Sequence, residues 1–361
     1  MAIFDLMKNK LKNAIAISLL PQVIMVKWLG SYPEWIERNY SEGIYPFLSK
    51  AYRALLGWVP FSVGDFIYAI LAFLALSYVI KARKTIFKTP RQFIRNLGMV
   101  LAVAYFTFNF CWGLNYYRQP IAQKFELSKT HTADELNHFV LALIAKTNTL
   151  QYTITKDTAT AVKIPYSKEE IFSKTLVGYK KIGHQIPFLS YERSSLKKSI
   201  FSTPLTYMGY GGYINPFTNE AQVNARLPEL RFPVVCAHEI GHQLGYAAEN
   251  ETNFIGYLVT ASNDDIYFQY AAAVYALSYC LSDIKRKDEA SFEKLYAQLN
   301  PGIKKSFAEI AAFWKAYENP LEPMFKSAFN TFLKANNQKD GIKSYSKVVS
   351  LLVTYYKKYP L

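Results

Sequence analysis

The sequence contains only three cysteines, Cys111, Cys236 and Cys280, among 361 residues. They are too few and too widely spaced for a disulfide-stabilised scaffold or for a cysteine-based zinc site. Charged residues are also scarce at 19%, whereas hydrophobic residues reach 51%, which excludes a disordered chain and a coiled coil. Acidic residues number 27 against 42 lysines and arginines, a formal net charge of +15. This excess of positive charge indicates either an anionic membrane surface or a nucleic acid as a partner.

Long uncharged stretches are confined to the first third of the sequence. Residues 96–117 contain no charged side chain in 22 positions, which is enough for a helix to cross a hydrocarbon core of about 30 Å. A second span at about 60–80 results if Asp65 lies close to the membrane boundary. The stretch at about 13–30 is interrupted by Pro21, so a cleaved or interfacial segment stays as an alternative there. We expect three transmembrane helices in this region.

The basic residues of the connectors predict the orientation of these helices. Residues 81–95 carry six basic side chains and no acidic one, and the N-terminus is rich in lysine. Because basic loops stay in the cytoplasm, both segments are expected inside and everything after Arg118 outside. We therefore expect a membrane domain at 1–118 and an extracytoplasmic domain at 119–361. The lipid bilayer then accounts for the charge, and no nucleic-acid partner is expected because no recognised module for one is present.

The second region, from Gln119 on, has no further stretch that would span a membrane. Residues 203–224 are rich in Tyr, Gly, Asn and Thr, which indicates short strands and turns. Amphipathic patterns elsewhere predict helices at 133–147, 167–182, 257–285, 290–299, 304–317, 322–335 and 344–358. The predicted fold is mostly α: three transmembrane helices followed by a mainly helical α+β domain with a small strand region.

Two of the five histidines lie four residues apart in the segment PVVCAHEIGHQLG. Its proline suits the first turn of a helix and Gly245 suits the end, and positions i and i+4 of a helix share one face. His238 and His242 can therefore bind one metal ion. Glu239, beside the first histidine, suits a general base that acts on water. This spacing favours Zn²⁺ as the cofactor and peptide-bond hydrolysis as the chemistry.

A zinc site of this kind needs a third protein ligand. Ala248 stands where the long metzincin pattern has a histidine, so an acidic residue of the following helix is expected instead. Glu251-Thr252-Asn253 resembles the Glu-Ala-Asp element of glutamate-zincins. We therefore expect Glu251 as the metal ligand and Asn253 as the residue that supports it, with Glu249 as the alternative ligand.

Three segments together resemble a known family. WGLNYYR, GYINPFTNEAQVNARLP and HEIGHQLGYAAENETNFIGYL are similar to an uncharacterised bacterial membrane family, domain of unknown function 3810. The resemblance covers nearly the whole chain, and Thr252 stands where the family pattern has alanine. It implies a multi-pass protein of the bacterial cytoplasmic membrane, with a zincin-like metallopeptidase domain at 119–361.

Residues near the motif are candidates for the substrate cleft. In zincins a strand before the metal-binding helix lines the cleft and pairs with an extended substrate, and the segment around 210–224 suits this role. The alternative is a glycine-rich turn whose tyrosines pack on the core. A tyrosine is also a candidate donor to the oxyanion. The candidate cleft residues are Tyr210, Tyr213, Asn215, Tyr246 and Tyr257.

These patterns predict a membrane-anchored zinc-dependent peptidase that hydrolyses an unidentified peptide or protein, with Glu239 as general base. The alternative is a non-catalytic membrane sensor or assembly module that retains a zincin fold and a structural metal. The two differ in turnover, because replacing Glu239 abolishes hydrolysis only in a peptidase.

Overall fold

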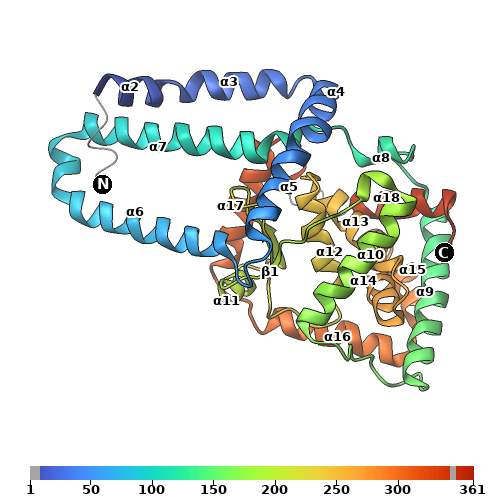
Figure 1. The fold of residues 1–361 in the computed structure, drawn as a ribbon. Helices are drawn as coiled ribbons and strands as arrows, with labels where there is room; N and C mark the ends of the chain where they lie inside the picture. Colours follow the sequence, from blue (N-terminus) through green and yellow to red (C-terminus); the bar gives the residue numbers. More distant parts are fainter. Residues whose placement is uncertain (1–8, 342–346) are drawn as a thin grey trace.

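The computed structural model describes residues 9–341 and 347–361, apart from the side chains of residues 84–87. A mainly helical body carries a group of long helices that project to one side (Figure 1). Strands are few in the described part of the chain and form one small sheet. The prediction of a mostly α protein is confirmed.

Two of the projecting helices are long and apolar enough to cross a membrane. They are α6 (Val63–Lys88) and α7 (Pro90–Cys111). The N-terminal stretch consists of α2 (Asn9–Ile17) and α3 (Leu19–Leu29), which pack along α7. This stretch qualifies as a candidate span only together with residues 33–56. The angle between the two segments is 93°. The described residues therefore contain two or three candidate spans, where we expected three.

The third expected span, 96–117, corresponds to α7, which begins and ends earlier in the sequence than we expected. α7 begins at Pro90, whose fixed φ suits the first turn of a helix, and ends at Cys111. Residues Gly113–Tyr117 form a short 3-10 helix, η2, whose tyrosines are buried. They are buried because η2 packs against the π-helix η1 (Ile36–Ile44) rather than facing solvent or lipid.

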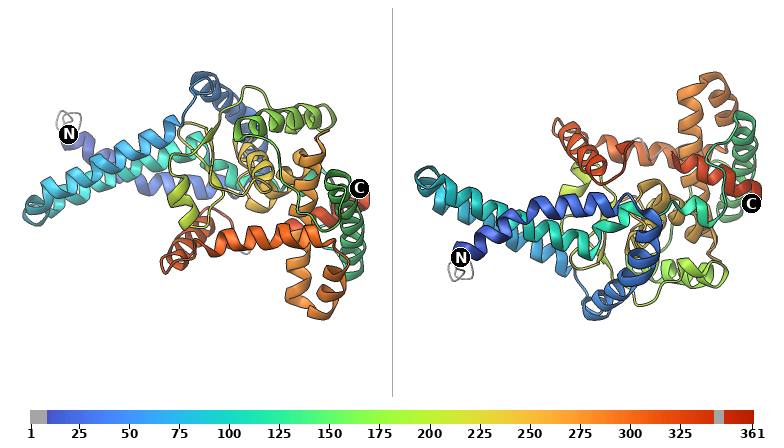
Figure 2. Two further views of the ribbon diagram at one scale, coloured as in Figure 1. Left: turned by 90° about the horizontal axis from the view of Figure 1, so that it is seen from below. Right: turned by 90° about the horizontal axis from the view of Figure 1, so that it is seen from above.

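The two basic segments of the first third lie at the same end of the projecting helices. The start of α2 and the connection between α6 and α7 both lie at the tip that is distant from the body (Figures 1 and 2). Both segments therefore lie on the same side of any membrane that these helices cross, opposite the body.

The body is organised around three consecutive helices, α12 (Phe232–Gln243), α13 (Glu249–Ala261) and α14 (Ile266–Lys287). α13 packs against both of the others, and α14 also packs along α9 (Ala133–Thr155). The apolar faces of these helices form the main core. The other helices are α4 (Pro33–Trp35), α5 (Tyr45–Leu56), α8 (Ile121–Lys124), α10 (Lys168–Gln185), η3 (Pro187–Leu189), α11 (Ser202–Tyr207), α15 (Glu289–Ala297), α16 (Pro301–Lys315), α17 (Glu322–Ala335) and α18 (Val348–Lys358).

Several predicted helices have different boundaries in the structure, and α9 continues to Thr155 where we expected an end at 147. The helix expected at 257–285 is divided, because the side chain of Asp265 caps a new helix. Its carboxylate accepts hydrogen bonds from the N–H groups of Tyr267 and Phe268, at 2.9 and 3.4 Å. The helix expected at 344–358 corresponds to α18, and its first three expected residues lie outside the described residues.

Two strands of the sheet lie in the region 203–224 where short strands were predicted, whereas the first strand precedes it and the start of the region is helical. The sheet contacts α12. Its strands are β1 (Leu196–Lys198), β2 (Gly212–Ile214) and β3 (Ala221–Val223), in the order β1-β3-β2. β1 pairs parallel with β3, whereas β2 pairs antiparallel with β3. Within the described residues β2 is thus an edge strand with one open side.

The first turn of α6 is attached to this sheet. Asp65 is fully buried, and its carboxylate accepts hydrogen bonds from Ser199 Oγ at 2.9 Å, from the Ile200 N–H at 2.7 Å and from the Tyr213 hydroxyl. Glu220 accepts hydrogen bonds from the N–H groups of the first residues of α6. The acidic residue in this apolar stretch is therefore a structural anchor inside the protein.

Residues 36–56, which we expected within the membrane domain, pack against the end of α12. The Tyr45 hydroxyl donates to the carbonyl of Gln243 at 3.0 Å, and Ser49 Oγ donates to the same carbonyl at 3.0 Å. Both side chains are buried. The N-terminal third thus contributes directly to the surroundings of the candidate site.

Candidate metal centre

α12 presents both motif histidines on one face. The helix begins at Phe232-Pro233, and Gly245 follows its end with φ +83°, a conformation that glycine adopts without strain. The rings of His238 and His242 lie 4.8 Å apart between centroids. Candidate ligand atoms of His238, Glu239 and His242 all lie within 4.8 Å of one another, which makes this the one such cluster among the described residues.

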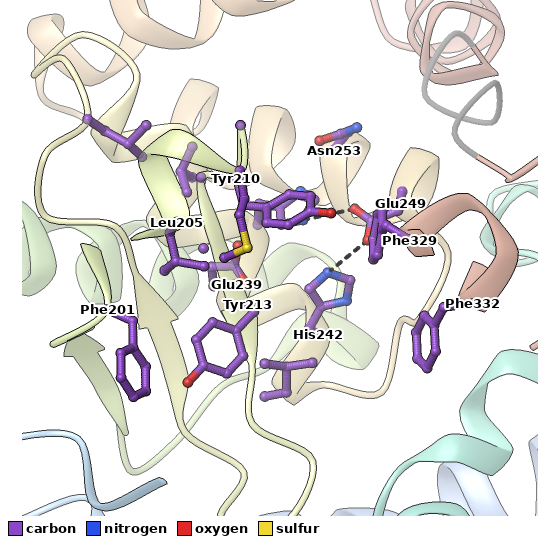
Figure 3. Close-up of a pocket in the computed structure, with 18 of the residues that line it drawn as sticks. Phe201, Leu205, Tyr210, Tyr213, Glu239, His242, Glu249, Asn253, Phe329 and Phe332 are labelled. Carbon is purple, nitrogen blue, oxygen red and sulfur yellow. Dashed lines mark ion pairs between the residues drawn. The ribbon is translucent and has the colours of Figure 1, made fainter. Parts of the chain in front are cut away.

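α13 adds a carboxylate to this pair. Glu249 Oε2 lies 3.4 Å from His238 Nε2, and Glu249 Oε1 lies 3.8 Å from His242 Nε2. Figure 3 shows Glu249 reaching toward His242 across the pocket. The side chain is only 10% exposed. The residue that we gave as the alternative ligand therefore lies next to both imidazoles.

Glu251, the ligand that we expected first, points elsewhere. Its Oε1 accepts a hydrogen bond from the N–H of Ile121 at 2.8 Å and so caps the first turn of α8. Successive helix residues are rotated by about 100°, so residues i and i+2 point to nearly opposite sides, whereas i and i+4 share one side. Asn253 consequently lies on the face of Glu249, not on that of Glu251. Glu249, two positions before Glu251, is therefore the acidic residue that shares a helix face with Asn253.

The His242 ring is oriented by the backbone. Its Nδ1 lies 2.8 Å from the carbonyl oxygen of Tyr246. A carbonyl only accepts, so Nδ1 carries the hydrogen and the lone pair of Nε2 faces His238 and Glu249. The indole of Trp112 donates to the His242 carbonyl at 3.2 Å, which fixes the end of the helix. Such outer contacts are typical of metal-binding histidines.

Asn253 lines the same cavity as His238 and acts to raise the pKa of that imidazole. Its Oδ1 accepts a hydrogen bond of 2.5 Å from the Tyr275 hydroxyl. Sequence reasoning identified Asn253 but not Tyr275, which comes from α14 and stands in no motif. The supporting role expected for Asn253 stays a prediction, and the acidic residue on its helix face is Glu249.

The ionisation of the cluster is strongly perturbed. Burial lowers the pKa of His242 to about 4, although Glu249 opposes the shift. Burial also acts to lower the pKa of His238, but Glu249, Glu239 and Asn253 together outweigh it and raise that pKa. Burial raises the pKa of Glu239 to about 8, and the Glu249 carboxylate adds to this shift. Two carboxyl groups thus share a buried site with a neutral imidazole.

These residues fit a divalent metal ion. Glu239 Oε2 is buried and has no hydrogen-bond partner among the described residues. The His242 Nε2 lone pair is directed at the same space, and Glu249 supplies an oxygen ligand beside both nitrogens. Two imidazole nitrogens with one carboxylate, and a second carboxylate nearby, are the donor set that zinc takes in hydrolytic sites.

The cluster faces a cavity of about 930 Å³. Tyr210 and Tyr213 line it, as expected. The other three candidate cleft residues do not line this cavity. Asn215 accepts hydrogen bonds from the backbone of its own turn. The Tyr246 ring is buried under the Arg118 guanidinium at 4.0 Å, and Tyr257 is buried in the core.

The open edge of β2 borders this cavity. Asn224 N–H donates to Gly211 O and Asn215 N–H donates to Glu220 O, so these opposed pairs carry the ladder hydrogen bonds. Along an antiparallel strand, every second residue forms backbone hydrogen bonds to the paired strand. Gly212 and Ile214 are the residues between, so their N–H and C=O groups point to the open edge. An added Cβ at Gly212 would lie 2.5 Å from both Glu239 Oε1 and Gln222 O. Glycine is therefore required where the strand passes Glu239.

A buried ion-pair network lies behind the site. Arg118 bonds Glu37 through Nε and Nη2, at 3.0 and 2.7 Å, and Lys124 lies 2.7 Å from Glu37. The same guanidinium also influences Glu251, whose pKa burial raises to about 7. These partners are more than eighty residues apart in the chain, so no local sequence pattern indicates their contact.

The geometry defines a mainly helical protein with two or three candidate membrane spans and a buried histidine–glutamate cluster at a large cavity. Comparison with protein families agrees with the sequence resemblance. Residues 40–353 match the family described as "Protein of unknown function (DUF3810)", and the chain belongs to this family. Neither the curated proteins nor the solved structures contain a match.

Proposed function

We propose that this protein is a membrane-anchored zinc-dependent peptidase. His238, His242 and Glu249 would hold Zn²⁺, in place of the set with Glu251 that the sequence favoured. One observation carries the proposal: the Glu249 carboxylate lies 3.4 and 3.8 Å from the Nε2 atoms of the two motif histidines. The free oxygen of Glu239 beside this set supports a role in chemistry as well as in binding.

When bound, zinc polarises the scissile carbonyl and lowers the pKa of a water molecule. Glu239 accepts a proton from the attacking water and returns it to the leaving nitrogen. The water oxygen forms a bond to the carbonyl carbon while the C–N bond breaks, so the products are a carboxylate and an amine. Gly212 and Ile214 hold the substrate backbone along the open edge of β2, as in other strand-addition complexes.

Metal removal tests this proposal. The full-length protein in detergent is incubated with a mixed peptide library or with a protein substrate. Each incubation is repeated after treatment of the protein with a chelator. We expect about one zinc per chain, hydrolysis that stops on chelation, and recovery when zinc is added back. A protein that holds zinc but cleaves no peptide bond would favour the non-catalytic sensor or assembly module instead.

A further inference from the structure

The cavity of the candidate site lies at the base of the projecting helices. α6 contributes Tyr68 to its wall, and α7 contributes Phe108, with Trp112 directly after that helix. In Figures 1 and 2 these helices leave the body on the side where α17 and α11 lie. α17 completes the wall with Phe329 and Phe332, which Figure 3 shows near Glu249 and His242. The ring of Phe332 packs against that of Phe108 from α7, at 6.2 Å between centroids.

These wall residues lie at the level of the membrane boundary if α6 and α7 cross a bilayer. Tyr68 is five residues after the start of the apolar segment at Val63, and Phe108 is three residues before its end at Cys111. At 1.5 Å per residue these offsets are roughly 7 and 5 Å. The cavity therefore borders the outer edge of the hydrocarbon region, where a chain leaves the lipid.

The wall outside the metal cluster is mainly apolar. Beside Tyr68, Phe108 and Trp112, it contains further large side chains from the sheet region and from two helices: Phe201, Leu205, Met208, Phe217, Leu227 and Trp314. Phe332 lines the cavity and is nevertheless 41% exposed. On the same helix, Met324 is 58% exposed, so apolar side chains continue from the cavity onto the surface.

We propose that the substrates are polypeptides anchored in the same membrane, with the bound segment directly outside their hydrophobic anchor. This inference rests on the proposed peptidase function and adds the substrate class. An anchored chain leaves the bilayer at the level of the cavity, can place an apolar side chain against Phe332 of α17, and can extend along the edge of β2.

Defined probes test the inference. Each peptide has a membrane-spanning segment of 20 leucines and alanines, then a polyproline spacer, then phenylalanine beside a photoreactive group. Spacers of 4 and 16 residues place this group roughly 12 and 50 Å from the membrane, because polyproline rises about 3.1 Å per residue. The same outer segment without the anchor serves as the soluble probe.

Binding is measured without turnover in the full-length Glu239→Gln variant in nanodiscs. Mass spectrometry reports cross-links to β2 and α17. We expect the short-spacer probe to label these segments at least about tenfold more than either the long-spacer or the soluble probe. Equal labelling by the three probes, or labelling only by a photoreactive lipid added in place of the peptides, would overturn the inference.

A matched pair of variants locates the contact. Phe332→Ala removes an exposed side chain that lines the cavity, whereas Met324→Ala removes an exposed side chain of the same helix outside it. Only Phe332→Ala should reduce labelling, by about tenfold, which is the usual effect of losing one buried aromatic contact. Equal effects of the two substitutions would contradict a cavity contact.

The wild-type zinc-loaded protein is then assayed for cleavage of the same probes. Labelling of the cavity by the short-spacer probe without any cleavage contradicts the peptidase proposal and supports the substrate class. Cleavage of the soluble probe at the rate of the anchored one supports the peptidase proposal and contradicts the substrate class. The two proposals therefore fail in different ways.

Discussion

Glu249 and Glu251 are two positions apart in the sequence, yet their surroundings differ completely. Glu249 faces two imidazoles across a cavity, whereas Glu251 caps α8 on the opposite side of α13. The motif alone does not distinguish them, because the distinction depends on where α13 begins and how it is rotated. This rotation is set by tertiary packing, so the motif predicts both candidates but cannot rank them, and the structure places Glu249 beside the imidazoles.

The two acids should affect zinc differently. We expect Glu249→Ala to weaken zinc binding by at least about 100-fold, because two protein ligands hold the ion poorly. Glu251→Gln should keep near-normal zinc affinity, although it weakens the cap of α8. Competition with a chromogenic chelator measures both affinities in the purified protein. Zinc loss in Glu251→Gln with normal affinity in Glu249→Ala would contradict the ligand assignment.

Gly212 offers a second comparison at the residue scale. In Gly212→Ala the new Cβ would meet Glu239 Oε1 and the backbone oxygen of Gln222, each at 2.5 Å. Since the paired strand cannot move freely, we expect a loss of stability of about 1–3 kcal/mol and a large loss of turnover.

Gly211→Ala is the matched control for this substitution. Its new Cβ would meet only side-chain carbons, of Val235 at 3.4 Å and of Leu227 at 3.7 Å, which are ordinary contact distances. Thermal unfolding measures the stability of the two variants, and peptide hydrolysis measures their turnover. Equal behaviour of the two variants would show that the close approach to Glu239 has no consequence.

At the scale of elements, patterns with strong local signals were predicted correctly and long-range contacts were not. The helix around His238 and His242 follows from its proline, its glycine and its apolar face, and the strand region follows from its glycines and tyrosines. Asp65 could only be assigned to the edge of an apolar stretch, because its partners Ser199 and Tyr213 lie far away in the chain. No local pattern encodes such a contact.

Asp265 lies where the predicted helix 257–285 is divided into α13 and α14. It caps α14, forms an ion pair with Lys174 at 2.8 Å and accepts a hydrogen bond from the Tyr166 hydroxyl at 2.6 Å. Burial acts to raise the pKa of Asp265, but Lys174, Tyr166 and the cap outweigh it and lower that pKa. The carboxylate therefore stabilises the fold above the ordinary pKa of an aspartate and loses this effect as the pH falls through the lowered value.

Asp265→Asn should reduce the free energy of unfolding by about 1–2 kcal/mol at pH 7, because the amide keeps part of the cap but not the ion pair. The difference from wild type should begin to shrink below about pH 4, because the carboxyl of the unfolded wild type then binds a proton, and it should disappear below the lowered pKa of the folded state. Thermal unfolding at pH 7 and pH 3 measures it. A difference that grows at low pH would contradict this account of the cap.

At the scale of the whole molecule, the projecting helices and the body are one connected structure. Asp65 connects α6 to the sheet, and the Trp112 indole, just after α7, donates to a carbonyl in the last turn of α12. The sequence predicted apolar spans and a separate domain, and the existence of two or three candidate spans agrees with it. The attachment of the spans to the site was not predicted, since periodicity and composition carry no information on it.

The orientation remains open to a direct measurement. A reporter enzyme that is active only outside the cytoplasm is fused after Leu361, and a second fusion is made after Arg83, at the end of the apolar segment of α6. We expect activity of the first fusion and none of the second, because basic connectors stay in the cytoplasm. Activity of the second fusion alone would reverse the topology and place the body inside the cell.

The central claim is that Glu239 performs chemistry beside a zinc ion held by its neighbours. Glu239→Gln keeps the size of the side chain but cannot accept a proton. The decisive experiment compares wild type with Glu239→Gln. Zinc content, unfolding temperature and the rate of peptide hydrolysis are measured on the same preparations. We predict unchanged zinc and unfolding temperature with hydrolysis reduced by about 10²–10⁴-fold, the usual cost of losing a general base. Hydrolysis at the wild-type rate, or loss of zinc together with unfolding, would contradict the claim.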